Sequence, residues 1–237
     1  MSLRKRPSEG GDGPGRVRGE ATRRRIKTTA RRLFATRGLD AVSIREIVRA
    51  AGQKNAGSVN YYFRSKDDLV RELILDVAKL LDDDHNRKLD EVEAAGGPRS
   101  IREIVAILIT YPTMDGDHRK KDEYALRFLN MIMINHRDLM FGALEGGLDR
   151  GTRRCMAHLR HFARDLPAVL IQQRLMLIIT YLFATASSLE ASLDRPRSPR
   201  SLWGHPAALS NLIDTVEGIL LQPASEETLR LLDDIPE

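Results

Sequence analysis

Apolar residues in this 237-residue chain recur mainly at helical spacing, and the first of them form a short stripe near the N-terminus. We predict a helix over about 22–37, ended by Gly38 in a left-handed conformation. Its inward positions are Ile26, Ala30, Leu33 and Phe34. The preceding residues mix Gly, Pro, Ser and Arg, so we expect a flexible basic arm over 1–20.

Two further helices are indicated by capping signals. Ser43 and Glu46 have the spacing of a capping box, which predicts a helix that starts at Ser43 and stops at Gly52. Its inward side is expected to hold Ile44, Ile47, Val48 and Ala51. After a tight turn, Asn55 can cap a third short helix that ends near Phe63. This order of helix, turn and helix is typical of a helix-turn-helix, although small helical hairpins without DNA partners share it.

The rest of the chain predicts longer helices and no strands. Ser65 precedes two acids and caps a long helix through Leu69, Leu73, Val77 and Leu80. Later apolar stripes occupy 101–109, 126–141, 156–162, 167–193 and 209–220. We therefore predict an all-α fold with a basic arm (1–20), a helix-turn-helix domain (21–66) and a helical domain (67–237).

Charge is distributed unevenly along the chain. Residues 1–37 hold twelve Lys or Arg against three acids, whereas the whole chain carries only +5. A basic end on a mildly acidic body favours a polyanionic partner, because Lys and Arg release the counterions condensed on phosphates. A solvated tail that serves solubility would give the same composition.

Other classes of function find little support in the sequence. No run reaches the roughly 18 apolar residues of a membrane helix, so we expect a cytoplasmic protein without a membrane partner. The single cysteine, Cys155, excludes an internal disulfide, and its spacing from His158 and His161 does not bring all three to one ion. Catalytic motifs and phosphate loops are absent from the sequence, so we expect no enzyme, no cofactor and no metal.

Several segments together resemble the DNA-binding domain of TetR-type (tetracycline-repressor-like) regulators. The resemblance covers about 20–75, and its most specific part is the string from Tyr61 to Leu69, with two aromatics, Phe, Ser, Lys and two acids. The interval from Gly52 to Phe63 is one residue longer than the commoner family pattern. The resemblance implies that the third helix enters the major groove and that Ser43, Arg45 and Lys66 contact phosphates. The full set of implied DNA-binding residues is Arg16, Arg18, Arg23, Ser43, Arg45, Asn55, Ala56, Gly57, Ser58, Asn60, Tyr61 and Lys66.

The resemblance also implies a homodimer and a ligand cavity. Two late helices would pair with their symmetry mates, through Leu175, Ile178, Leu182, Leu209, Leu212, Ile213, Val216 and Leu220. Met and aromatic residues make adaptable apolar pockets, although each is also an ordinary core residue. The residues named for the cavity are Met114, Tyr124, Phe128, Met131, Met133, His136, Phe162 and Tyr181.

These observations favour a ligand-responsive regulator, most simply a repressor. It would bind a palindromic operator as a dimer and be released by a small, largely apolar effector. Two alternatives from other classes are a helical module whose basic tail binds RNA or membranes, and an enzyme with an unrecognised site. Removal of 1–65 would abolish duplex binding in the first case and leave catalysis intact in the last.

Overall fold

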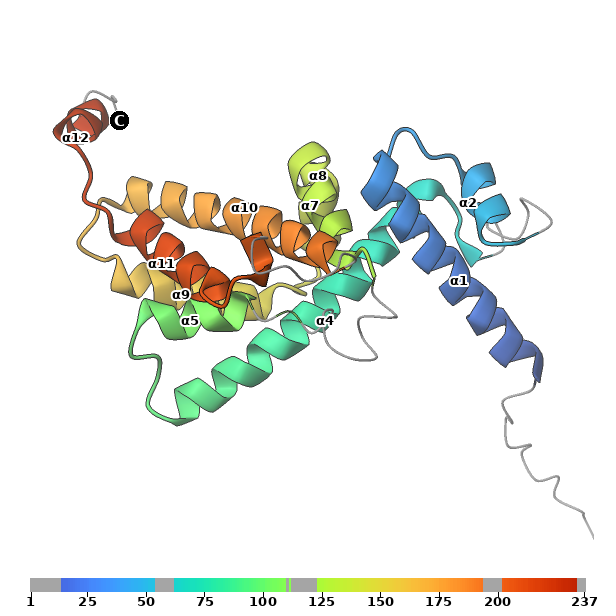
Figure 1. Ribbon diagram of the computed structural model, residues 1–237, viewed down its shortest axis with the longest axis horizontal. Coiled ribbons are helices and arrows are strands. Elements are labelled where there is room, and N and C mark those ends of the chain that lie inside the picture. The colour runs from blue at the N-terminus through green and yellow to red at the C-terminus, as the bar shows by residue number, and fades with distance from the viewer. Residues whose placement is uncertain (1–13, 54–61, 110, 112–122, 194–201, 234–237) are drawn as a thin grey trace, which may run out of the picture.

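The computed structural model describes residues 14–53, 62–109, 111, 123–193 and 202–233, and every regular element in these ranges is helical (Figure 1). The N-terminal part consists of α1 (Pro14–Arg37), α2 (Ile44–Ala50) and the first turns of α4 (Lys66–Ala94). The remainder holds α5 (Ile101–Ile109), α7 (Ala125–Asn135), α8 (Arg137–Leu144), α9 (Arg150–Phe162), α10 (Ala168–Ser192), a short 3₁₀ turn η2 (Leu202–Gly204), α11 (Ala208–Leu221) and α12 (Glu226–Asp233). The predicted all-α class is confirmed.

The first helix is longer than predicted, because α1 begins at Pro14 rather than near residue 22. Residues 14–20 were expected to belong to a flexible arm, and that expectation is wrong for this part of the arm. Proline favours the first position of a helix because its fixed φ suits the helix and its missing N–H would be unpaired there in any case. The remainder of the predicted arm, 1–13, lies outside the described residues.

The long helix α4 joins the two parts of the molecule (Figure 1). Its first turns pack with α1 and α2, in a core that extends to α7 through the contact of Phe34 with Phe128. A second core lies between α5, α9, α10 and α11, and Leu89 near the end of α4 belongs to it. Because one continuous helix takes part in both cores, a displacement of α4 in one part is transmitted to the other.

The predicted stripe over 126–141 is divided into two helices, α7 and α8. The division lies at His136, whose backbone leaves the helical region at φ −140° and ψ 50°. The His136 carbonyl then accepts hydrogen bonds from the amides of Leu139 and Met140, which starts α8 in a new direction. No Gly or Pro marks this break in the sequence, so helical periodicity alone gave one element.

Helices α10 and α11 pack together, and most of the residues predicted to face a partner subunit lie in the core that these helices share. Seven of the eight predicted dimer residues are buried within their own chain, and only Leu209 is exposed. The strongest apolar stripe of each helix thus faces the chain's own core. The buried seven are Leu175, Ile178, Leu182, Leu212, Ile213, Val216 and Leu220.

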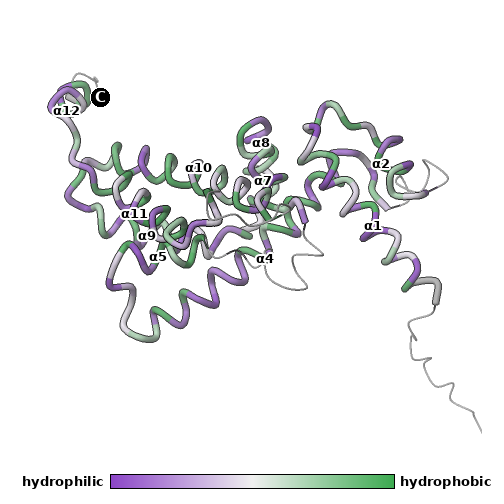
Figure 2. Tube along the Cα trace, viewed as in Figure 1, coloured by the Kyte–Doolittle hydropathy of each residue, from purple (hydrophilic) through white to green (hydrophobic). Residues whose placement is uncertain are grey.

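A second, exposed stripe runs along α10 at four-residue and three-residue intervals. It includes Val169, Leu177, Thr180, Ala184 and Ser188, and the Leu177 side chain is 59% exposed. Figure 2 shows that apolar positions recur along most of the length of this helix. By length and composition α10 could cross a membrane, contrary to the expectation from the sequence, and only 28% of its most apolar stretch is buried within the chain. Core helices of soluble proteins meet the same criterion.

Helices α4 and α9 approach each other closely at Gly151. A Cβ atom at this position would lie 2.6 Å from the His85 Cβ and 3.1 Å from the Asp82 carbonyl oxygen. The Gly151 amide also donates to Asp82 Oδ1 at 2.6 Å. Further along the same pair of helices, Arg154 bonds to Asp90 and Glu93 at 2.7 Å each. Only glycine therefore allows this spacing of the two helices.

We expect Gly151→Ala to lower the free energy of unfolding by about 2 kcal/mol, because overpacking forces two helix backbones apart. Gly142→Ala in α8 is the matched control, since a Cβ there meets nothing within 4 Å and alanine is the better helix former. That control should gain up to about 1 kcal/mol. Urea denaturation at equal protein concentration measures both variants. A Gly151→Ala protein as stable as the wild type would contradict the close approach.

Candidate DNA-binding face and ligand cavity

The start of α2 is held by the predicted capping box, which the structure confirms. The Ser43 amide donates to Glu46 Oε2 at 2.8 Å, and the Glu46 amide donates to Ser43 Oγ at 3.3 Å. Arg37 at the end of α1 adds an ion pair to Glu46 at 3.0 Å. Hydrogen bonds from the Ser43 backbone and side chain, and then from Arg37, lower the pKa of Glu46 to about 2. The carboxylate thus stays ionised and ties α2 to α1.

The turn after α2 also follows the prediction. Gly52 has a φ of +69°, and the Gln53 amide returns to the Val48 carbonyl at 3.0 Å. Ile47 and Val48 are the buried residues of α2. Residues 54–61 lie outside the described residues, and they contain the predicted groove-facing residues Asn55, Ala56, Gly57, Ser58, Asn60 and Tyr61. The description resumes with a helical, half-buried Tyr62 and a buried Phe63.

Two residues that were predicted to contact DNA form contacts within the helix-turn-helix domain. Arg23 forms an ion pair with Glu72 on α4, and its guanidinium carbon lies 5.1 Å from the centre of the Phe63 ring. Lys66 donates from Nζ to the Leu39 carbonyl at 2.7 Å. Both contacts connect separate elements of the helix-turn-helix domain. The charge pattern did not indicate these internal contacts.

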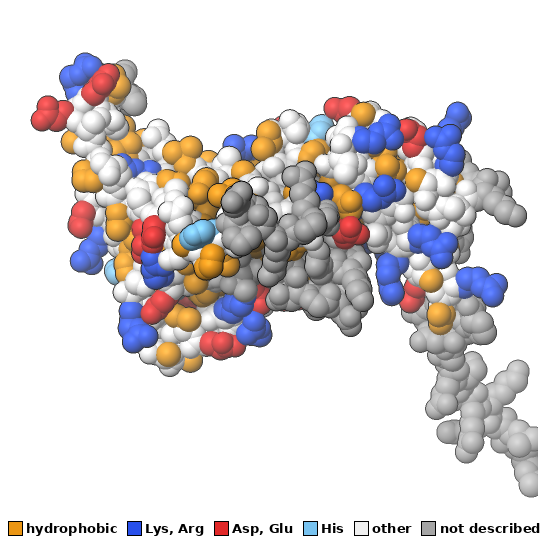
Figure 3. All heavy atoms as spheres, in the orientation of Figure 1, with side chains coloured by type: hydrophobic (Ala, Val, Ile, Leu, Met, Phe, Trp, Pro, Cys, Tyr) orange, Lys and Arg blue, Asp and Glu red, His pale blue; other side chains and the backbone are white. Residues whose placement is uncertain are grey.

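Three other residues of the predicted DNA set are at the surface. Arg18, Ser43 and Arg45 are exposed, and Arg16 belongs to α1. Figure 3 shows Lys and Arg side chains gathered over α1 and α2. Exposed arginines that the sequence reasoning did not name add to this face: Arg24, Arg25, Arg32, Arg37, Arg49 and Arg64. On α1 they occupy positions between the residues of the buried stripe, a signal that was present in the sequence.

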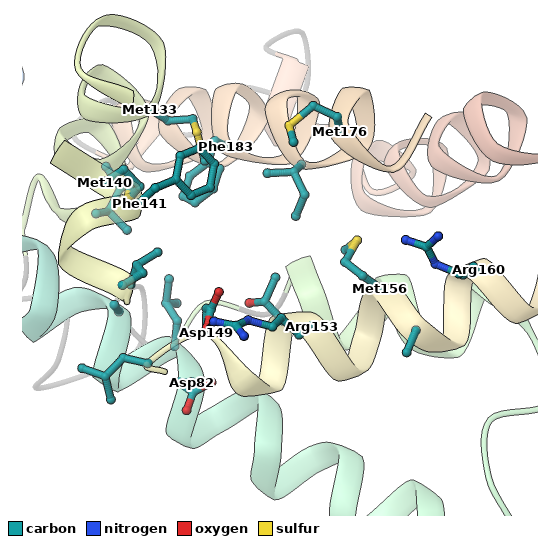
Figure 4. Close-up of a pocket in the computed structure, with 18 residues that line it drawn as sticks. Asp82, Met133, Met140, Phe141, Asp149, Arg153, Met156, Arg160, Met176 and Phe183 are labelled. Atoms are coloured by element: carbon teal, nitrogen blue, oxygen red, sulfur yellow. Dashed lines mark ion pairs between the residues drawn. The ribbon is translucent and has the colours of Figure 1, made fainter. Parts of the chain in front are cut away.

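A cavity of about 440 Å³ lies in the second part of the molecule, between α4, α7, α8, α9 and α10 (Figure 4). Its wall is mainly apolar and rich in flexible side chains. Met133, Met140, Phe141 and Phe183 lie together at one end, while Met156 on α9 and Met176 on α10 face each other across the middle. Four of the seven methionines in the sequence therefore line one cavity. Ala78, Leu81 and Asp82 of α4 complete the wall.

Charged groups lie along one edge of this cavity. Arg153 and Arg160 project from α9, and Arg153 forms an ion pair with Asp149 at 2.6 Å. Arg160 donates to Gln172 on α10 at 3.1 Å. Asp82 is occupied by the Gly151 amide. The interior is left to apolar side chains, and polar recognition is possible at the edge.

Only Met133 of the predicted ligand residues lines this cavity. Phe128 and Met131 belong to the core that α7 shares with α1, while Phe162 and Tyr181 pack in the core of α5, α9, α10 and α11. Tyr124 precedes α7 at a φ of +66° beneath the Arg127 guanidinium, and His136 separates α7 from α8. Met114 lies outside the described residues. These four core residues therefore do not line this cavity, because helical periodicity reports burial but not which cavity a buried residue faces.

Residues 26–73 match the model of a known family, whose description is bacterial regulatory proteins, tetR family. This segment of the chain is therefore similar to the tetR family of bacterial regulatory proteins. The HTH-type transcriptional repressor KstR2 of Rhodococcus jostii (strain RHA1) is 29% identical over 133 residues, a match that covers 52% of this chain and 63% of that repressor. The match therefore spans less than two thirds of the length of KstR2.

Solved structures of TetR-family proteins share the fold. A TetR-family transcription regulator from Shewanella sp. PV-4 superposes with a TM-score of 0.55 and 16% identity, over 82% of this chain and 95% of that one. The regulator PfmR from Thermus thermophilus gives a TM-score of 0.51 and 17% identity, over 84% and 100% of the two chains. At such identities the likeness shows the fold alone.

Helix α4 is where the candidate DNA-binding face and the cavity meet. Its first turns are fixed to α1 by acids, since Glu72 binds Arg23 and Asp76 binds Lys27 at 2.5 Å. Just beyond Asp76, α4 begins to line the cavity through Ala78. Helix α4 is thus fixed to the helix-turn-helix domain, called the reading domain below, and it also lines the cavity.

Proposed function

We propose that the protein is a cytoplasmic, ligand-responsive transcriptional repressor that binds a palindromic operator as a homodimer and is released by a small effector. The observation that carries this proposal is the position of α4, which leaves the helix-turn-helix domain and forms part of the cavity wall. A ligand that displaces α4 would tilt the reading domain. Reciprocal coupling between effector and operator is then expected.

The homodimer is supported by the exposed stripe on α10. Val169, Leu177 and Ala184 would remain in water in a single chain, and contiguous exposed apolar surface of this kind is typical of an interface. Figure 3 shows apolar side chains at the surface in this region. Two reading domains must stand about 34 Å apart to enter successive major grooves, which requires a fixed dimer.

A largely apolar effector is supported by the wall of the cavity. Methionine adapts its shape to irregular ligands, and four methionines with Phe141 and Phe183 cover most of the interior. A volume of about 440 Å³ is within the range of small-molecule sites. Binding would exploit burial of apolar surface, with orientation set by the few polar groups present.

The experiment begins with the full-length protein and fragmented genomic DNA of its source. Selection of bound fragments identifies the operator, and fluorescence anisotropy then gives its Kd over a range of salt concentrations. Arg45→Ala should weaken binding and make the slope of log affinity against log salt shallower by about 1, because one phosphate contact is lost. Arg99→Ala, an exposed arginine distant from α2 in the sequence, is the control and should leave both quantities unchanged.

The proposal fails if the purified protein shows no preference for any duplex at low salt. It also fails if sedimentation shows a monomer at the concentrations at which the operator is bound, since one reading domain contacts too few bases. If Arg45→Ala instead kept the wild-type salt slope, the result would show that α2 does not belong to the DNA-binding face.

A further inference from the structure

A second, smaller cavity of about 50 Å³ adjoins the larger one. The two share four lining residues, so a single layer of side chains separates them: Leu81, Thr152, Ile179 and Phe183. The other residues that line this smaller cavity, called the inner cavity below, are His85, Leu108, Tyr111 and Leu182. Its volume exceeds the roughly 10–15 Å³ that one water molecule requires, so a small polar group fits there.

The inner cavity contains an unsatisfied histidine. His85 is 4% exposed, and its Nδ1 lies 3.3 Å from Thr152 Oγ1. Its Nε2 has no hydrogen-bond partner within the described structure. Buried polar atoms are paired in nearly all native proteins, and an unpaired one points to an absent partner. The position of His85 on the inner cavity makes a ligand atom the natural partner.

The charge state of His85 restricts that partner to a neutral group. Burial lowers the pKa of His85 to about 4. Asp84 and Asp82 on the same helix raise the pKa and Lys88 lowers it, and the effect of burial is the largest. Across the cavity, Thr152 is uncharged, and burial raises the pKa of Tyr111 above its ordinary value. The imidazole is therefore neutral near pH 7, and no cation lines the described wall of the inner cavity.

We propose that the effector places a hydroxyl group in the inner cavity, hydrogen-bonded to His85 Nε2, while its apolar body fills the larger cavity. This inference rests on the proposed function and names the chemistry of its ligand. A hydroxyl both donates and accepts, so it pairs with either neutral tautomer of the imidazole. A carboxylate would be desolvated there without a counter-charge.

The hydrogen bond would also explain how α4 senses the ligand. His85 and the cavity-lining Leu81 lie one helical turn apart on α4, so a ligand held at Nε2 is attached directly to this helix. Entry from the larger cavity requires displacement of Phe183, the largest side chain in the shared wall. Apolar filling alone would leave α4 without a directional contact.

The test compares two probes of the same shape, 4-butylphenol and butylbenzene, with the full-length protein. Calorimetric titration should show the phenol binding about 3-fold to 10-fold more tightly, the net gain of one buried hydrogen bond. In His85→Leu the ratio of the phenol affinity to the butylbenzene affinity should fall to about 1, while butylbenzene binds as before. Tyr111→Phe removes the phenolic hydroxyl from the wall of the inner cavity and leaves His85 in place. It is the matched control, and the ratio of the two affinities should stay at the wild-type value.

A second measurement uses the wild type and does not depend on the folding of a variant. The imidazole ¹⁵Nε2 resonance of His85 should shift on addition of 4-butylphenol and not on addition of butylbenzene. A phenol preference that survives His85→Leu, or equal binding of both probes with no shift, would overturn the inference and leave a structural water as the partner of Nε2. Failure of both probes to bind at all would instead count against the larger cavity as the effector site, and with it against the proposed function.

Discussion

Phe128→Ala should lower the free energy of unfolding by about 3–5 kcal/mol, the loss expected when a large aromatic is removed from a closed core. Phe128 and Phe34 are both fully buried, and their ring centres lie 6.3 Å apart across the contact of α7 with α1. The cavity left by alanine would therefore open between the N-terminal helices and the part that holds the larger cavity. Urea denaturation followed by circular dichroism, at fixed protein concentration, measures the change.

Phe141→Ala is the matched control for this variant. Phe141 is 46% exposed on α8, and it lines the larger cavity rather than the core. Its removal should cost less than about 1 kcal/mol, because little buried apolar surface is lost. Equal losses for the two variants would show that the contact between α1 and α7 does not hold the two parts together.

The elements best predicted from the sequence are those set by local chemistry. Ser43 with Glu46, and Ser65 with Asp68, cap α2 and α4 through hydrogen bonds between neighbours in the chain. Gly38 and Gly52 adopt positive φ where the predicted helices end. These features depend on a few adjacent residues, so they can be read without knowledge of the tertiary structure.

The charge pattern indicated a basic end correctly but overestimated the cations available to DNA. Lys27 and Arg23 on α1 are bound by Asp76 and Glu72 of α4. About fifty residues separate the arginine from its acid, so no local pattern in the sequence announces the pair. Long-range ion pairs of this kind depend on how α1 and α4 pack, which only the structure supplies.

The cavity wall and the exposed stripe of α10 were the least predictable parts. Phe128 and Met133 lie on one helix, yet the first belongs to the core and the second lines the cavity. On α10, Ile178 is buried in the chain while its neighbour Leu177 is exposed. An apolar residue is equally suited to a core, a cavity or a partner, so its identity alone does not distinguish these environments.

The other substitution with a large expected effect replaces Glu190, a buried carboxylate at the junction of α10 with α7. Glu190 accepts hydrogen bonds from the amides of Leu126 and Arg127, at 3.1 and 3.0 Å, and from Arg127 Nε at 3.2 Å. It thus caps α7, whose own N-cap residue, Tyr124, makes no side-chain cap. Glu190→Leu would leave two backbone donors and a half-buried guanidinium without this acceptor, and we expect a loss of about 3–5 kcal/mol.

The size of the loss in Glu190→Gln separates the role of the charge from that of the hydrogen bonds. Burial raises the pKa of Glu190 despite the three donors, so the ionised form gains little from its surroundings. The neutral glutamine keeps one acceptor oxygen and should lose only about 1–2 kcal/mol. Glu227→Ala, an exposed acid in α12, is the control and should change stability by less than about 0.5 kcal/mol. A loss in Glu190→Gln as large as that in Glu190→Leu would mean that the charge, rather than the cap, holds α10 to α7.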